Sequence, residues 1–259
     1  PDDLSWKAYQ AAGGQLSRGD WRRESVNIFI KRIYEEIKAE KPHVKFGLSP
    51  FGIWRPGYPE SVQGYDQYDK LYADAKLWLN EGWIDYYTPQ LYWKISQLGQ
   101  SFPELLGWWQ SENTKQRHLW PGITEVINQI MITRGMLPQS KGAVHWSIGP
   151  LIKNPELAKA LKEGPYRKKT LVPPSPWLDN TPPEIPNVTV NENLDKMEIT
   201  WGVENEEDIH KWVLYFKYET GNWDYKILNS EKRSQDLQKE VGEKKTKLQK
   251  IGVTEVDRT

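Results

Sequence analysis

The sequence predicts an α/β fold, because its first 180 residues alternate four times between a helix and a short apolar strand. Alternation of this kind is typical of a parallel sheet covered by helices, and ligands bind where such strands end. The expected strands are residues 44–49, 83–88, 118–121 and 143–147.

Aromatic residues after these strands are the main indication of function. The chain has 14 Trp and 13 Tyr, and a flat ring can pack against the C–H face of a sugar at low entropy cost. Most of these Trp residues are expected in cores. Trp78 and Trp109, for example, belong to the apolar faces of predicted helices. The loops at 52–58, 89–93, 122–125 and 148–150 are instead expected to face solvent. They predict a sugar-binding cleft.

Five helices are expected between and after the strands. The first begins at Asp20 as N-cap and stops before Pro42, and the second ends at Gly82. The third carries Pro103 in its first turn, the fourth ends near Gly135, and the fifth covers residues 155–163 after the cap Asn154. Apolar residues recur every three or four positions: Val26, Ile30, Ile33 and Ile37; Tyr68, Leu71, Tyr72, Ala75, Trp78 and Leu79; Phe102, Leu105, Leu106 and Trp109; Val126, Ile127, Ile130 and Met131.

Prolines between residues 173 and 186 mark a stiff connector, beyond which the helical period disappears. Short alternating stretches then follow at a spacing of about ten residues, which predicts a small all-β sandwich with Trp201 in its core. The stretches are residues 187–190, 196–201, 212–218, 225–228, 236–241 and 247–256.

Composition excludes several functions. Lys+Arg and Asp+Glu both total 35, so a zero net charge gives no long-range attraction to nucleic acid. No apolar run approaches the roughly 18 residues of a membrane-spanning helix. The chain lacks cysteine, and its four histidines share no ligand spacing, so no metal site is expected. No phosphate-binding glycine loop or serine-hydrolase turn is present, so no cofactor is expected either.

Several motifs resemble the glycoside hydrolase-like family 10, bacterial envelope proteins with a (β/α)8 barrel. The most specific is FGLSPFGIWRPG at residues 46–57, and the others are residues 20–23, 89–93, 120–122, 145–147 and 174–179. Such a barrel needs eight strands and about 250 residues. The resemblance therefore implies the C-terminal half of a TIM-type barrel over residues 1–180. Residues 181–259 resemble a fibronectin type III module without its last strand.

The resemblance implies a glycosidase of the cell envelope, periplasmic or extracellular, that acts on peptidoglycan-type glycan strands. In the family an acidic motif closes the strand just before the segment that matches Asp2 and Asp3, so we expect the main catalytic acids upstream of residue 1. A non-catalytic glycan-binding protein and a structural or interaction scaffold remain as alternatives. A half-barrel leaves two strand edges unpaired, which predicts an edge-to-edge homodimer or aggregation.

Glycoside hydrolysis usually needs two carboxylates, about 5 Å apart for retention or about 6.5–9.5 Å for inversion. Glu125 is the acid that directly follows an expected strand, although it could simply stabilise the next helix through its dipole. Asp85 lies early in its strand, where a structural role is expected. Asp2 and Asp3 are expected in a solvated loop. Glu125 is thus the catalytic candidate within this chain.

The expected binding residues follow three strands. Trp54 could stack on a sugar while Arg55 donates to hydroxyls or a carboxylate; alternatively, Trp54 packs on a neighbouring loop and Arg55 pairs with an acid. Gln90 and Tyr92 are expected to line the cleft and to hydrogen-bond the sugar, with Trp93 beside them.

Two further candidates end the fourth strand. His145 could donate to a sugar hydroxyl or satisfy a backbone carbonyl, and Trp146 lies next to it. Trp120, at the end of the third strand, is expected in the core or on the cleft floor.

Overall fold

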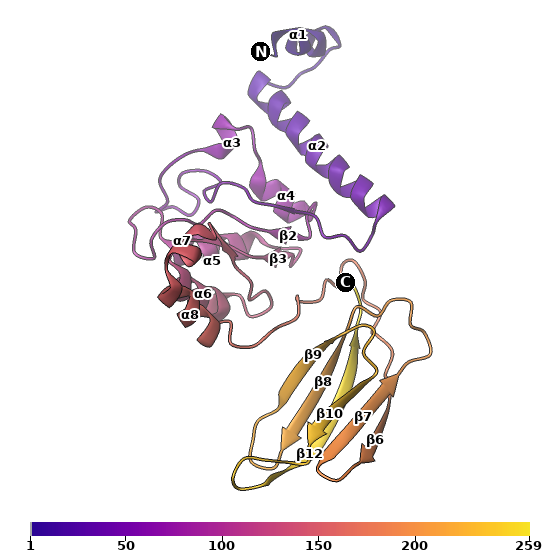
Figure 1. Cartoon of the computed structure of the whole chain (residues 1–259). Helices are drawn as coiled ribbons and strands as arrows, with labels where there is room; N and C mark the ends of the chain where they lie inside the picture. Colours follow the sequence, from indigo (N-terminus) through magenta and orange to yellow (C-terminus); the bar gives the residue numbers. More distant parts are fainter. Residues whose placement is uncertain (1) are drawn as a thin grey trace. The chain divides into compact units, whose positions relative to one another are not determined.

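The computed structural model describes residues 2–259, and the chain divides into two compact units, one ending at Lys168 and one spanning Lys169–Thr259. Figure 1 shows helices with short strands in the first unit and long strands in the second. Mixed helix and sheet content of this kind is consistent with an α/β domain. Among the described residues, no helix is both long enough and apolar enough to cross a membrane.

The strands of the first unit pair in parallel. β1 (Gly47–Leu48), β2 (Tyr86–Tyr87) and β3 (His118–Leu119) form one sheet in that order, and β4 (Gly122–Ile123) pairs with β5 (Val144–His145). Single parallel bridges join Phe51 to Gln90 and Gln90 to Gly122. Parallel pairing at the four expected places is confirmed. The prediction that residues 122–123 form a solvent-facing loop is wrong, because β4 pairs with β5 and both of its residues are buried.

The first unit contains more helices than expected. The bounds are α1 (Asp3–Ala11), α2 (Arg18–Glu40), α3 (Gln67–Lys70), α4 (Ala75–Glu81), α5 (Phe102–Glu112), α6 (Val126–Met136), α7 (Gly149–Lys153) and α8 (Pro155–Glu163). α1 and α7 were not expected. The expected N-cap at Asp20 is also wrong. α2 begins two residues earlier, and the hydroxyl of Ser17 accepts from the backbone N–H of Asp20 at 3.1 Å.

The expected second helix is broken into α3 and α4. Tyr72 has a φ of 54°, which no helix residue adopts, and Asp74 then caps α4 by accepting from the N–H of Leu77 at 3.3 Å. The expected end at Gly82 is confirmed by its left-handed φ of 72°. On α6 Met131 is exposed, so it does not belong to the buried stripe.

α5 and α8 follow the sequence prediction closely. All four stripe residues of α5 are fully buried, and Pro103 lies in its first turn. α8 starts after Asn154, whose side chain accepts from the N–H of Leu157 at 3.1 Å. Local chemistry is enough to define both helices.

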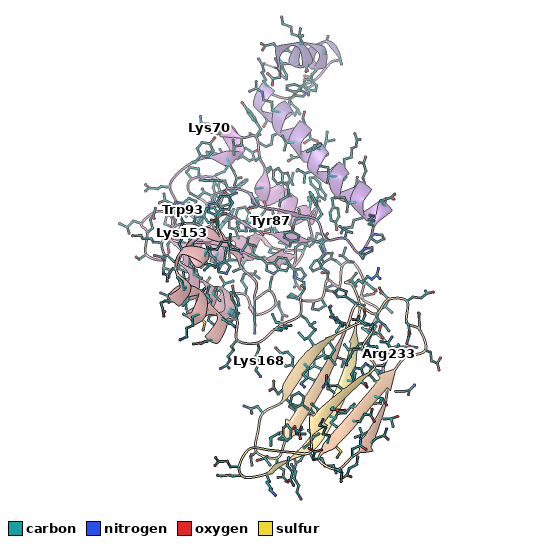
Figure 2. All side chains as sticks on the ribbon, in the orientation of Figure 1. Lys70, Tyr87, Trp93, Lys153, Lys168 and Arg233 are labelled. Carbon is teal, nitrogen blue, oxygen red and sulfur yellow. The ribbon has the colours of Figure 1, made fainter. Side chains whose placement is uncertain are left out.

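The two faces of the parallel sheet differ. On one face lies Tyr87, which is labelled in Figure 2. It is fully buried, donates to the carbonyl of Ala75 at 2.5 Å, and meets Trp109 edge-on at 5.4 Å. On the other face Trp120 stacks on Tyr86 at 5.1 Å and on His118 at 5.0 Å. The first face belongs to the core of this unit, and the second carries a row of stacked rings.

The second unit consists of antiparallel strands in two sheets that share one core. β10 (Ser234–Gln238), β7 (Lys196–Gly202) and β6 (Asn187–Glu192) form one sheet, and β11 (Glu240–Val241), β12 (Thr246–Val256), β8 (Lys211–Tyr218) and β9 (Asp224–Asn229) form the other. Trp201 and Trp212 meet between them at 6.2 Å, so the core role of Trp201 is confirmed. The fibronectin type III assignment stays a prediction.

Candidate functional site

Gln90 lies where the two groups of parallel strands join. It bridges to Phe51 on one side and to Gly122 on the other. Its side-chain amide donates to the carbonyl of Ser49 at 3.1 Å. Gln90 is therefore at the ends of neighbouring strands, where ligands bind in parallel sheets.

Tyr92 and Trp146 come together from the segments after β2 and β5. Their rings stack at 5.9 Å with an interplanar angle of 26°. Trp146 is 66% exposed. Tyr92 also lies against Gly122, where an added Cβ would come within 2.8 Å of Tyr92 Cε1, so the close approach needs glycine there. The result is an exposed Trp146 indole with the ring of Tyr92 stacked against one of its faces.

Glu125 lies just before α6 but its side chain makes no cap hydrogen bond. Its carboxylate accepts instead from the backbone N–H of Ile95 at 3.1 Å. Trp93, two residues before Ile95, meets Phe51 edge-on at 5.6 Å. Glu125 is thus joined to the segment that follows β2 (Trp93 is labelled in Figure 2).

Gln129 on α6 was missed by the sequence reasoning. Its side chain is fully buried, and Oε1 accepts from the backbone N–H groups of Thr124 at 2.9 Å and Glu125 at 2.7 Å. Its Nε2 donates to the carbonyl of Trp93 at 3.0 Å. A polar residue on the otherwise apolar stripe of α6 was the available signal.

Trp54 and Arg55 form a separate cluster. The indole N–H of Trp54 donates to Asp74 at 3.0 Å, and its ring lies 6.0 Å from that of Trp108. Arg55 is 3.4 Å from a carboxylate oxygen of Asp66 and 3.5 Å from one of Asp69. These contacts correspond to the packing alternative for this pair.

His145 precedes Trp146 and faces a different partner. Its Nε2 lies 2.8 Å from the hydroxyl of Tyr166, and the tautomer decides which of the two donates. Burial lowers the pKa of His145 below its ordinary value, which favours the neutral imidazole. The partner is thus a side-chain hydroxyl rather than a backbone carbonyl.

The other acids considered have structural partners. Asp85 is fully buried, 2.5 Å from Lys38 Nζ, and accepts from the N–H of Phe46 at 2.7 Å. Asp2 pairs with Arg18 and Arg22, which hold the pKa of its carboxyl well below the usual range. Asp3 is the first residue of α1 and pairs with Arg18. The expected loop is wrong for Asp3, which lies in a helix although 70% of its side chain is exposed. Asp2 directly precedes that helix, and its side chain is only 28% exposed. Among the described side chains, no group of three or more acids and histidines could hold a metal ion.

Residues 5–132 match the family model described as Glycosyl hydrolase-like 10. This segment is related to that family. The glycosyl hydrolase YngK of Bacillus subtilis is 40% identical over 212 residues, which cover 73% of this chain and 41% of that protein. The glycosyl hydrolase DigH of Escherichia coli is 36% identical over 108 residues, 40% of this chain and 25% of that protein.

The family match and the relatives support a glycosidase-like function. The alignments span less than half of the length of either glycosyl hydrolase. The segment related to the glycosyl hydrolase-like 10 family includes Trp54, Gln90, Tyr92 and Glu125, and it ends before His145 and Trp146.

Proposed function

We propose that this chain is part of a glycoside hydrolase-like protein that binds glycan strands of the bacterial envelope, of the peptidoglycan type, at the ends of β2, β4 and β5. The observation that carries the proposal is the exposed indole of Trp146 stacked on Tyr92. A sugar ring can lie on that indole, because its C–H face matches a flat aromatic surface. Gln90 and Tyr92 offer hydrogen bonds beside it.

Hydrolysis would need a second carboxylate in addition to Glu125. We propose that the main catalytic acids come from a part of the barrel outside these 259 residues, as the resemblance of the motifs implies. In this arrangement the chain supplies the aromatic surface and the residues that position the glycan. The N–H of Ile95 would keep the carboxylate of Glu125 in one orientation.

Glycan binding without hydrolysis is the second candidate. It is favoured by the acids of the separate Trp54 and Arg55 cluster, which already have partners within the chain. Asp66 and Asp69 both lie beside Arg55, and Asp74 accepts from Trp54. A carboxylate held in this way is less available as a general acid or base.

We also propose a location in the cell envelope, periplasmic or extracellular, and a fibronectin type III-like role for the second unit. Self-association is proposed through strand edges. β1 is the first strand of its sheet order and β5 the last of its pair, so each offers a side to a strand of a second copy.

The first experiment measures binding of purified, peptide-free peptidoglycan glycan strands by quenching of tryptophan fluorescence. Trp146→Ala should weaken binding by about tenfold, the equivalent of one aromatic contact of about 1.4 kcal/mol. Trp223→Ala is the matched control, since Trp223 is also exposed but lies in the turn between β8 and β9. Equal affinity of Trp146→Ala and wild type would refute the proposed surface.

Hydrolysis of the same strands separates the two candidates. Cleavage only by a version extended upstream with the acidic strand supports the first candidate, in which the main catalytic acids lie outside these 259 residues. Cleavage by the 259-residue chain would contradict it and direct attention to Glu125, Asp2 and Asp3. Binding without cleavage by either version supports the second candidate, and no binding at all refutes both.

A further inference from the structure

We infer that Gln129 is a positioning residue, which fixes the segment carrying Tyr92 and Trp93 against the segment carrying Thr124 and Glu125. This inference rests on the proposed function, because these two segments border the proposed glycan site. Gln129 itself is fully buried and does not reach a ligand. Its effect on binding would be exerted entirely through the backbone groups that it holds.

The side-chain amide of Gln129 satisfies three backbone groups at once. Oε1 uses both lone pairs, accepting from the N–H groups of Thr124 at 2.9 Å and Glu125 at 2.7 Å. Nε2 donates to the carbonyl of Trp93 at 3.0 Å. These groups belong to different strand ends, since Trp93 follows β2 and Thr124 follows β4. One side chain therefore links two loops that are far apart in the sequence.

Two more hydrogen bonds cross the same junction. The hydroxyl of Thr124 donates to the carbonyl of Tyr92 at 3.1 Å, and the N–H of Ile95 donates to the carboxylate of Glu125 at 3.1 Å. The side chains of Thr124 and Glu125, which make these two bonds, are both at least partly accessible to water. Gln129 is instead anchored in α6, beside the buried Ile130. Gln129 is therefore the buried member of this group of side chains and is held by a helix.

Loss of the amide would leave three backbone groups without their partner. A buried polar group without a partner costs more than the hydrogen bond itself contributed, so the loops would move to find water or other partners. That movement would shift Tyr92, which supports Trp146, and would also shift the carboxylate of Glu125. The expected consequence is a weaker site in a chain that still folds.

A merely structural role is the competing explanation, in which Gln129 caps the start of α6 and affects only stability. Thr133 provides a matched control for it. Thr133 is also fully buried, lies one turn later on α6, and donates to the carbonyl of Gln129 at 2.7 Å. In these contacts Thr133 touches neither loop. Gln129→Met and Thr133→Val both remove a buried polar group with little change of volume.

The test combines two measurements on the full chain. The first is native-state hydrogen exchange of the amides of Thr124 and Glu125, which depends on the hydrogen bonds and not on any ligand. Gln129→Met should speed this exchange by about three- to tenfold, the equivalent of one hydrogen bond, whereas Thr133→Val should leave it unchanged. The second is the glycan-strand titration, in which Gln129→Met should weaken binding by a similar factor and Thr133→Val should not.

Each outcome decides the inference. Unchanged exchange in Gln129→Met overturns the link between the loops, and faster exchange with wild-type affinity overturns its role in binding. No glycan binding by the wild type refutes the proposed function, while exchange still reports separately on the link. If Gln129→Met does not fold, Gln129→Glu replaces it, since a carboxylate still accepts from Thr124 and Glu125 but repels the carbonyl of Trp93. It should weaken binding and leave the exchange of those two amides slow, and wild-type affinity would overturn the inference.

Discussion

The buried carboxylate of Asp85 offers the most direct test of how the first unit is held together. Its Oδ2 lies 2.5 Å from Lys38 Nζ and accepts from the N–H of Phe46 at 2.7 Å, and the hydroxyl of Tyr34 is 3.3 Å from Oδ1. Burial raises the pKa of Tyr34 to about 12, so this phenol stays protonated and can donate. Asp85 thereby connects α2 to the start of β1.

Replacing Asp85 by Asn keeps the shape and removes the charge. Lys38, whose side chain is only 17% exposed, would then lack its counter-charge. Breaking a buried ion pair from one side costs about 3–5 kcal/mol. Because Lys38 still reaches some solvent and bonds to the carbonyl of Val44, we expect the lower end, about 3 kcal/mol, and a fall in Tm of about 6–12 °C.

Glu36→Gln is the matched control on the same helix. Glu36 pairs with Arg32 at 2.8 Å, but both side chains are more than half exposed, with 73% for Arg32 and 65% for Glu36. An exposed pair of this spacing contributes about 0.3–0.5 kcal/mol. A Lys38→Met change in the Asp85→Asn background should cost less than the two single changes added together, because the ammonium of Lys38 is then no longer present without its counter-charge.

The assay is urea unfolding followed by tryptophan fluorescence, with the transitions of the two units fitted separately. Equal stability of Asp85→Asn and Glu36→Gln would refute the reasoning, since it would mean that the buried charge carries no more energy than an exposed one. The glycan affinity of folded Asp85→Asn should equal that of the wild type.

Two further predictions concern pH and assembly. The lowered pKa of His145 means that the folded chain binds this proton less tightly than the unfolded chain, so its contribution to the free energy of unfolding is present above pH 6.5 and is lost as pH falls through the folded pKa. His145→Gln should remove this part of the pH dependence in urea titrations on either side of pH 6.5, and an unchanged profile would contradict it. In sedimentation the 259-residue chain should form dimers or larger species through its strand edges, and a monomer that unfolds cooperatively would contradict edge pairing.

The sequence alone determined those parts of the fold that depend on local chemistry. The four apolar segments were found because helix and strand periods differ, and their parallel pairing follows from the alternation. α5 was predictable from its stripe and from Pro103, and α8 from the cap Asn154. Strands of the second unit were visible from their alternation, and Trp201 from its place among them.

The limits of prediction appear where one segment needs another. The apolar pattern of the expected second helix continues through Leu71 and Tyr72, yet the chain turns at Tyr72, whose φ is positive. The Tyr72 hydroxyl accepts from Arg22 of α2, a contact between distant segments that no local pattern records. β4 could not be predicted from the sequence for the same reason. Gly122 and Ile123 become a strand only because β5 lies beside them.

Candidate residues show the same division. Residue type and place after a strand were enough to nominate Gln90, Tyr92 and Trp146. Whether Trp54 would face a ligand or pack inside could not be decided without knowing that Asp74 lies next to its indole. For Gln129 the sequence offered only a polar residue on an otherwise apolar helix face. Its role depends on backbone groups in two different loops, and one of them, the carbonyl of Trp93, is 36 residues away. The sequence determined which residues could act, and only the tertiary structure decided which of them meet, because a hydrogen bond depends on distances between segments that no local pattern records.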